Sequence, residues 1–394
     1  MTKAFLAVAV AALTAMLVPG NFAAEKHYII TNDDNSTPGA NTATIFEVNT
    51  ETAALKQVRV LQTGGTGGGG GYFAAPRNAI DSSGKCLFVS DAGTSDIASF
   101  ATPDFTKVGN YSDSQLNGAL PGMGVTASPN GRYLFAAYSN SDNIAVWNIG
   151  SDCSLTLNGS PYSPGGAPDS IAVTPDGNEL VVSMPDSGEI TSFSVSPAGA
   201  LTAQPALQFA RVGDCRMCLH EPAGLDITND GKTVVAANAS PYAPYYILTA
   251  TLSSAGLSSP GYHTHSTATA NPQTVWFSPG AADGHGILYV GMTGFDAPKH
   301  AGIVSVEFNE TPLRMSYVTE VRDSGPINYG SIQTIGTSGT GGLLAVAEQQ
   351  QSGSAIDVYK VNGNTGALTQ NSTTNDPQSG NLQSITAFPK RPTH

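Results

Sequence analysis

Apolar and polar residues recur along this chain in a unit that repeats about every 50 residues. Each unit has an apolar strand, a turn with glycine, a second apolar strand, a polar loop and a third strand. The clearest copies are residues 77–100, 124–149, 169–195 and 223–248. Units of this period are typical of β-propeller blades, in which each blade completes the core of its neighbour. The pattern therefore predicts an all-β propeller.

Turns that end in glycine mark the inner hairpin of each unit. They occur at Ser83-Gly84, Asn130-Gly131, Asp176-Gly177 and Asp230-Gly231, and in looser form at Asp283-Gly284 and Thr340-Gly341. These turns predict six complete blades.

Two strands remain at the ends of the chain. Residues 382–389 look like an inner strand with nothing after it, and residues 27–32 look like a second strand with nothing before it. We expect the two to pair in one shared blade, because closing the ring removes exposed strand edges. The sequence thus predicts seven four-stranded antiparallel blades.

The first 24 residues are expected to lie outside this fold. Lys3 precedes an apolar run from Ala4 to Val18, and the small residues Ala23 and Ala24 follow. This order is typical of a secretory signal, whereas a membrane anchor needs about 20 apolar residues. We therefore expect an exported protein, periplasmic or extracellular, with the propeller over residues 25–394 and no membrane span after signal removal.

Composition narrows the classes of partner. The chain has 44 Gly and 25 Pro with 12% charged residues, and no segment keeps a helical apolar period, which favours a turn-rich all-β fold. Without Lys3, 16 Lys and Arg stand against 30 Asp and Glu, a net charge of −14. Nucleic-acid binding needs clustered basic residues, so we expect no nucleic-acid partner. We also expect a monomer.

Four cysteines in an exported protein favour disulfides. Cys86 opens the second strand of its blade, and Cys153 lies in the turn after the third strand of the next blade. The first and third hairpin turns of a blade emerge on the same face, so these two cysteines can meet. Cys215 and Cys218 lie together in one loop. Of the three pairings, we expect Cys86–Cys153 with Cys215–Cys218.

Several phrases resemble a known family. They are YIITNDDN at residues 28–35, the turns SPNG and TPDG, the strands LFV and LVV, and TGGTGGGGGYFAAP at residues 63–76. They are similar to the bacterial lactonase-like seven-bladed propellers, which include propeller-type 6-phosphogluconolactonase and the muconate-cyclising enzymes. The resemblance covers roughly residues 27–389. It implies the architecture, but many propellers with this blade pattern are not enzymes.

The family resemblance also implies where catalysis would occur. In the lactonase-type enzymes, histidines at the starts of several inner strands move protons together with Arg and Glu partners. The corresponding positions here carry Asp169, Ala223, Gln273 and Tyr329, and Arg77 is the one inner-strand arginine. Opening a lactone needs an acid or base near neutral pH and a positive group for the developing oxyanion. The missing histidines favour a non-catalytic module that binds a small molecule, glycan or protein at the channel mouth.

The residues expected to line this mouth begin inner strands or precede them: Arg77, Asp169, His220, Glu221, Gln273, Tyr329 and Gln383, with Glu348 reaching the same rim from a second strand. One alternative is a lactone hydrolase in which Arg77 holds the carbonyl oxygen and Glu221 or Glu348 is the base. Another is a structural repeat protein of the cell envelope.

Metal and haem sites have weak support. The loop from Cys215 to His220 lacks the direct Cys-His junction of a haem attachment, since Leu219 intervenes. Two thiolates with His220, joined by His263 or His265, are acceptable zinc ligands, but an oxidising compartment favours the disulfide. We therefore expect no metal and no cofactor.

Two polar segments have ordinary explanations. The turns at residues 32–35 and 140–143 offer oxygen ligands for Ca²⁺ but lack the order of an EF-hand, and they are typical of Asx turns. The glycine-rich run Thr63–Gly71 leads into a strand and lacks a Gly-Lys-Ser/Thr ending, so it is not a phosphate cradle. We expect a mobile connection between blades, over the channel.

Overall fold

The computed structural model describes fourteen segments of the chain. They are residues 26–69, 75–118, 123–210, 219–240, 247–263, 271–279, 285–293, 302–310, 313–322, 327–335, 341–350, 353–362, 365–379 and 381–389. The expected signal, residues 1–24, and the expected pair Cys215 and Cys218 lie outside the described residues.

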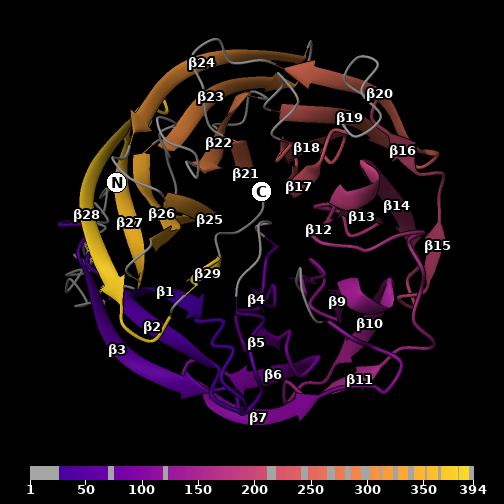
Figure 1. Ribbon diagram of the computed structural model, residues 1–394, viewed down its shortest axis with the longest axis horizontal. Coiled ribbons are helices and arrows are strands. Elements are labelled where there is room, and N and C mark those ends of the chain that lie inside the picture. The colour runs from indigo at the N-terminus through magenta and orange to yellow at the C-terminus, as the bar shows by residue number, and fades with distance from the viewer. Residues whose placement is uncertain are drawn as a thin grey trace, which may run out of the picture.

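Seven antiparallel sheets are arranged as blades around a central axis (Figure 1). Blade 1 contains β4 (Asn78–Ile80), β5 (Cys86–Asp91), β6 (Asp96–Ala101) and β7 (Thr106–Tyr111). Blade 2 contains β8 (Val125–Ala127), β9 (Tyr133–Tyr138), β10 (Asn143–Ile149) and β11 (Leu155–Leu157). Blade 3 contains β12 (Ile171–Val173), β13 (Glu179–Met184), β14 (Glu189–Val195) and β15 (Leu201–Ala203), and a short strand β16 (Leu207–Gln208) also pairs with β14.

Three further blades follow in chain order. Blade 4 contains β17 (Pro222–Ile227), β18 (Thr233–Asn238), β19 (Ile247–Ser253) and β20 (Gly256–His263). Blade 5 contains β21 (Asn271–Pro279), β22 (His285–Thr293), β23 (Gly302–Glu310) and β24 (Leu313–Arg322). Blade 6 contains β25 (Ile327–Ile335), β26 (Gly341–Gln350), β27 (Gly353–Asn362) and β28 (Leu368–Asp376). The helical segments among the described residues are two short 3₁₀ turns, η1 (Ser139–Ser141) and η2 (Pro185–Ser187).

The two ends of the propeller form the shared blade. Its inner strand is β29 (Ser384–Phe388), followed outward by β1 (His27–Asn32), β2 (Thr42–Val48) and β3 (Leu55–Gln62). The register places Asn32 opposite Ser384 and Tyr28 opposite Phe388. The predicted seven-bladed ring, closed by both ends, is confirmed.

Glycine turns define the inner hairpins, as the sequence predicts. Gly84, Gly131, Gly177 and Gly231 all have φ between +68° and +76°, a conformation that a side chain disfavours. In the first of these turns, Gly84 N–H donates to Asp81 O at 3.0 Å, and the Asp81 carboxylate accepts N–H groups from the strand that follows.

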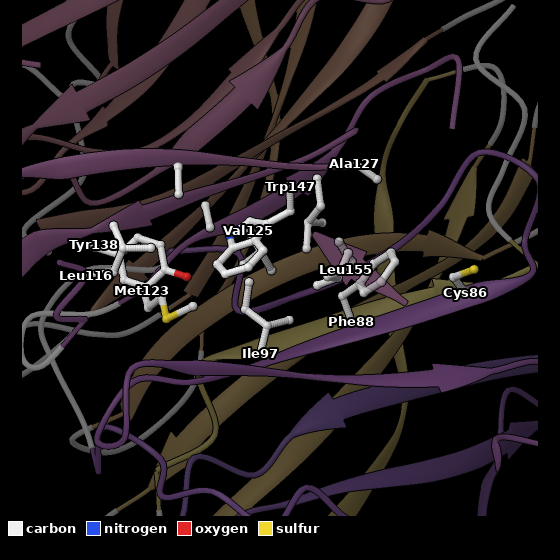
Figure 2. Close-up of a cluster of buried hydrophobic side chains, with 14 of the residues drawn as sticks. Cys86, Phe88, Ile97, Leu116, Met123, Val125, Ala127, Tyr138, Trp147 and Leu155 are labelled. Atoms are coloured by element: carbon white, nitrogen blue, oxygen red, sulfur yellow. The ribbon is translucent and has the colours of Figure 1, made fainter. Parts of the chain in front are cut away.

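The core lies between adjacent blades. Figure 2 shows one such cluster, in which Phe88 and Ile97 of blade 1 pack with Val125, Tyr138 and Trp147 of blade 2. The second strands β5, β9 and β13 are buried along their whole length, whereas the outer strand β7 is mostly exposed. Each blade therefore depends on its neighbours to cover both of its faces.

The ring has two faces, and the strand ends and loops on one differ from those on the other. We call the face at which each inner strand begins and each second strand ends the rim face. The Cys86–Cys153 disulfide joins blades 1 and 2 on the opposite face, with a Cα–Cα distance of 5.4 Å, and this pairing is as predicted. None of the described residues forms a helix with the length and hydropathy of a membrane span.

Candidate functional site

A buried ion pair lies on the rim face, between blade 1 and the shared blade. Arg77 immediately precedes β4, and its side chain forms an ion pair with Asp34, which follows β1. Both side chains are 1% exposed. Asp34 Oδ1 also accepts the Gly68 N–H at 2.7 Å. The pair thus joins the turn after β1 to two places, Gly68 and Arg77, in the connection that precedes β4.

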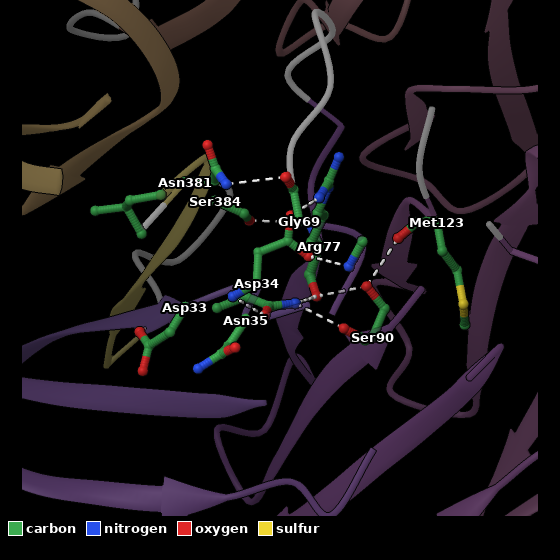
Figure 3. A network of polar contacts seen from close by, with 12 residues as sticks. Asp33, Asp34, Asn35, Gly69, Arg77, Ser90, Met123, Asn381 and Ser384 are labelled. Atoms are coloured by element: carbon green, nitrogen blue, oxygen red, sulfur yellow. Dashed lines mark hydrogen bonds and ion pairs between the residues drawn. The ribbon is translucent and has the colours of Figure 1, made fainter. Parts of the chain in front are cut away.

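The backbone of Arg77 is fixed from several strands (Figure 3). Its N–H donates to Ser384 Oγ at 2.8 Å, and its carbonyl oxygen accepts Ser90 Oγ at 3.0 Å and Asn32 Nδ2 at 3.2 Å. Ser384 starts the inner strand of the shared blade, and Ser90 lies near the end of β5. The closure of the ring and the placement of Arg77 therefore share the same hydrogen bonds.

Asp169 is a second buried group on the rim face, just before β12 of blade 3. It is 0% exposed, and neither carboxylate oxygen has a hydrogen-bond partner among the described residues. Burial raises the pKa of Asp169 to about 7, and the positive charge of Arg77 opposes that rise. A buried carboxyl group whose pKa is raised toward neutrality is typical of functional sites.

A glycine-rich connection covers the Asp34 turn. Gly67 N–H donates to Asn35 O at 2.8 Å, and Gly69 N–H donates to Asp34 O at 3.2 Å. A Cβ atom on Gly67 would lie 2.3 Å from the carbonyl carbon of Asp34, so this approach requires glycine. The described part, residues 63–69, is a connection between blades as expected; its mobility stays a prediction.

Asp91 anchors the start of the same connection. It ends β5, and its Oδ1 accepts Asn41 Nδ2 at 2.6 Å and Thr63 Oγ1 at 2.7 Å. Burial raises the pKa of Asp91 to about 7, against these hydrogen bonds and the charge of Lys107. Lys107 Nζ donates to Thr63 O at 2.6 Å.

His220 and Glu221 lie before β17 in blade 4. The His220 ring is 5.0 Å from that of Tyr262, and its Nδ1 is 3.0 Å from Asn238 Nδ2. Burial lowers the pKa of His220, which favours the neutral form of the ring. Burial and the charge of Asp186 raise the pKa of Glu221.

Glu348 and Gln383 are also buried, with 1% and 5% of their surface exposed. Glu348 lies near the end of β26, opposite Tyr329, and its Oε1 accepts Gln350 Nε2 at 2.8 Å. The Gln383 carbonyl oxygen accepts the Ser331 N–H at 2.7 Å.

The remaining predicted residues are placed by their backbones. Gln273 lies in β21 at a bulge between Pro272 and Thr274, and Tyr329 lies in β25; their side chains are outside the described residues. Within the described segments, no three His, Cys, Asp or Glu side chains are arranged to hold a metal ion.

Sequence reasoning singled out Arg77 and Asp169 but missed Asp34 and Asp91. Asp34 has φ of +53°, and its N–H donates to Asn32 Oδ1 at 3.1 Å, so it does form the predicted Asx turn. Its carboxylate nevertheless pairs with an arginine 43 residues away. The sequence signal that could have pointed to Asp34 was its position in YIITNDDN, a segment that resembles the lactonase-like propellers.

Comparison with known proteins agrees with this architecture. The family model described as "Lactonase, 7-bladed beta-propeller" matches residues 39–154 and 111–208. No curated protein matches the sequence. The resemblance to lactonase-like propellers that the sequence predicts is confirmed by the family match.

Solved structures with the same fold cover nearly the whole chain. A Lactobacillus plantarum protein superposes with a TM-score of 0.69 at 16% identity, covering 92% of this chain and 100% of its own. The periplasmic gluconolactonase of Pseudomonas aeruginosa gives 0.69 at 13% identity, covering 92% and 99%. A putative 6-phosphogluconolactonase from Bacteroides uniformis gives 0.67 at 15% identity, covering 92% and 99%. Likenesses at these identities show the fold alone.

Proposed function

We propose that this lactonase-like seven-bladed propeller hydrolyses an unphosphorylated sugar lactone at the rim face, with Arg77 and Asp169 as its catalytic residues. The observation that carries the proposal is the wholly buried Asp169 carboxyl, which has no hydrogen-bond partner among the described residues and whose pKa burial raises to about 7 against the positive charge of Arg77. The family match and the gluconolactonase named among the similar structures support the reaction class. In this proposal Asp169 is the base, whereas the lactone-hydrolase alternative in the sequence analysis gave that role to Glu221 or Glu348.

The proposed reaction needs one base and one oxyanion donor. Ionised Asp169 removes a proton from water as the water attacks the lactone carbonyl carbon. Negative charge develops on the carbonyl oxygen, where Arg77 stabilises it. The ring C–O bond then breaks, and protonated Asp169 returns its proton to the leaving alkoxide. The product is an open-chain hydroxy acid.

The surroundings of Arg77 suit this role. The ion pair with Asp34 fixes the orientation of the Arg77 guanidinium, and a fixed positive charge of this kind stabilises a developing oxyanion. Asp34 is itself fixed by the Gly68 N–H, so the cation need not reorganise as charge develops.

Charge and hydrogen bonding favour a neutral, hydroxyl-rich substrate. The charge of Arg77 is balanced by Asp34, and the chain carries a net charge of −13. A phosphate group prefers clustered cations. The two Asp169 oxygens have no donor among the described residues, and sugar hydroxyls can supply donors. Export, predicted from residues 1–24, is in line with the periplasmic gluconolactonase named among the structures of similar fold.

Binding without catalysis is the second candidate. It is favoured by the absence of histidine at the starts of the inner strands and by the engagement of His220 with Asn238. The same buried acceptors would then hold a hydroxylated ligand without turning it over.

The test compares glucono-δ-lactone with its 6-phosphate in a pH-stat. We expect the parent to hydrolyse the unphosphorylated lactone faster than buffer and faster than the phosphate ester. Asp169→Asn removes the base and should reduce the rate by about 10²–10⁴-fold. Glu179→Gln is the matched control, because Glu179 is a buried carboxyl that starts β13 on the opposite face.

Two results would contradict the catalytic role. One is a parent rate equal to buffer, and the other is full activity in Asp169→Asn. Calorimetry with glucono-δ-lactone separates the candidates further: binding of the lactone without hydrolysis above the buffer rate would support the non-catalytic module.

A further inference from the structure

One buried carboxamide side chain holds the backbone of both partners of the Asp34–Arg77 ion pair. Asn32 is the last residue of β1 and is wholly buried. Its Oδ1 accepts the Asp34 N–H at 3.1 Å, and its Nδ2 donates to the Arg77 carbonyl oxygen at 3.2 Å. The two charged residues are thus fixed relative to each other through the same amide group.

The remaining hydrogen bonds of Asn32 fix the orientation of its amide. Nδ2 also donates to the Ser90 carbonyl oxygen at 2.7 Å, and Oδ1 also accepts Asn41 Nδ2 at 3.0 Å. A carboxamide has two N–H donors and two acceptor positions, so all four are used. The opposite orientation would place Nδ2 beside two donors and Oδ1 beside two carbonyl oxygens. The network therefore admits a single orientation of this amide.

Asn41 holds Asn32 from the side of the glycine-rich connection. Asn41 is also wholly buried, and its Nδ2 donates to Asp91 Oδ1 at 2.6 Å as well as to Asn32. Its Oδ1 accepts the Asn35 N–H at 2.9 Å. The position of the Asn32 amide is therefore fixed by the end of β5 and by the turn after β1, in addition to β1 itself.

Ring closure supplies a second anchor for Arg77. Asn32 lies opposite Ser384 in the register between β1 and β29, and Ser384 Oγ accepts the Arg77 N–H at 2.8 Å. Figure 3 shows Ser384, Ser90 and Asp34 beside Arg77. The N–H and the carbonyl oxygen of Arg77 are each held by one member of the Asn32–Ser384 cross-strand pair.

We propose that Asn32 is the positioning residue of Arg77, because its amide holds the arginine and the carboxylate that orients it in one arrangement. Asn32 acts through Arg77. The part of the inference that concerns turnover rests on the proposed function, whereas the hydrogen bonds of Asn32 do not depend on any ligand. A cation that stabilises a developing oxyanion acts in the transition state, so displacing it lowers kcat rather than raising KM.

The first test replaces the amide by groups that cannot make its four hydrogen bonds. Asn32→Asp keeps the shape of the side chain but turns an oxygen, in place of a donor, toward the carbonyl oxygens of Arg77 and Ser90. Asn32→Ser introduces no charge and covers the case in which Asn32→Asp does not fold. We expect the ¹⁵Nε signal of Arg77, identified by its loss in Arg77→Lys, to shift in both variants.

The matched control is Asn238, which occupies the corresponding place in blade 4. It is the last residue of β18, is wholly buried, and its Oδ1 accepts the Glu221 N–H at 2.9 Å. Asn238→Asp and Asn238→Ser should also lower the Tm, because they too remove partners of buried polar groups. They should leave the Arg77 signal at its parent position. An Arg77 signal unchanged in the folded Asn32 variants, or shifted equally in the Asn238 variants, would overturn the positioning role.

Turnover of glucono-δ-lactone gives the second readout. In Asn32→Ser we expect kcat to fall by about 10²-fold with little change in KM, because a catalytic group displaced by about 1 Å can lose that much rate. Full kcat in folded Asn32→Ser, or an effect on KM alone, would contradict the proposal. If the parent itself does not hydrolyse the lactone, the proposed function fails, whereas the Arg77 signal still decides whether Asn32 positions Arg77. The two failures are therefore distinguishable.

Discussion

At the scale of single residues, burial decides the chemistry of the rim face. Arg77 and Asp169 could be singled out from the sequence because each precedes a predicted inner strand. Their mutual influence and the pairing with Asp34 could not be predicted, since the partners lie on different blades. The raised pKa of Asp169 likewise depends on how neighbouring segments cover it, which no local pattern encodes.

Removing one partner of the buried Asp34–Arg77 ion pair should destabilise the fold far more than removing one partner of a surface pair. Asp34→Asn leaves a buried guanidinium without its counter-charge, and we expect a loss of about 3–5 kcal/mol in the free energy of unfolding. Asp230→Asn is the comparison, because the Asp230–Lys232 pair is exposed and should contribute below about 1 kcal/mol. Urea unfolding measures both, and a similar cost for the two substitutions would contradict the buried-pair assignment.

At the scale of elements, strands and hairpins were largely predictable. Glycines with positive φ form the inner hairpins of blades 1 to 4. The Cys86–Cys153 pairing could be predicted because the first and third hairpin turns of a blade emerge on the same face. The glycine-rich connection was harder to interpret, because the sequence shows its composition but not what it approaches. Gly67 is glycine because it touches the backbone of Asp34, which is itself part of the site.

Gly67 and Gly68 provide a matched test of this connection. In Gly67→Ala, the added Cβ would lie 2.3 Å from the Asp34 backbone, whereas in Gly68→Ala it would make contacts of 3.4 Å with Ala92 and Arg77. We expect Gly67→Ala to lose about 1–3 kcal/mol of stability and to lower lactone turnover. Gly68→Ala should be much milder in stability. Equal stabilities for the two variants, measured by thermal unfolding, would show that the close approach is not tight.

At the scale of the whole molecule, ring closure and site assembly use the same residues. Ser384 holds the Arg77 N–H, Asn381 Nδ2 donates to Gly69 O at 2.9 Å, and Ser379 holds the Asp33 carbonyl oxygen. The closed ring followed from two unpaired strand patterns at the chain ends. That closure also builds the site was not predictable, because it depends on contacts between residues some 300 positions apart.

The pH dependence of kcat/KM for glucono-δ-lactone is the sharpest test of Asp169 as the catalytic base. The base must be ionised, so kcat/KM should rise with pH, show an apparent pKa near 7 and level off above it. Asp169→Asn should lose both the rate and this titration, while Glu179→Gln keeps them. A parent that shows no turnover, or a titration near pH 7 that survives in Asp169→Asn, would contradict the assignment of Asp169 as the base.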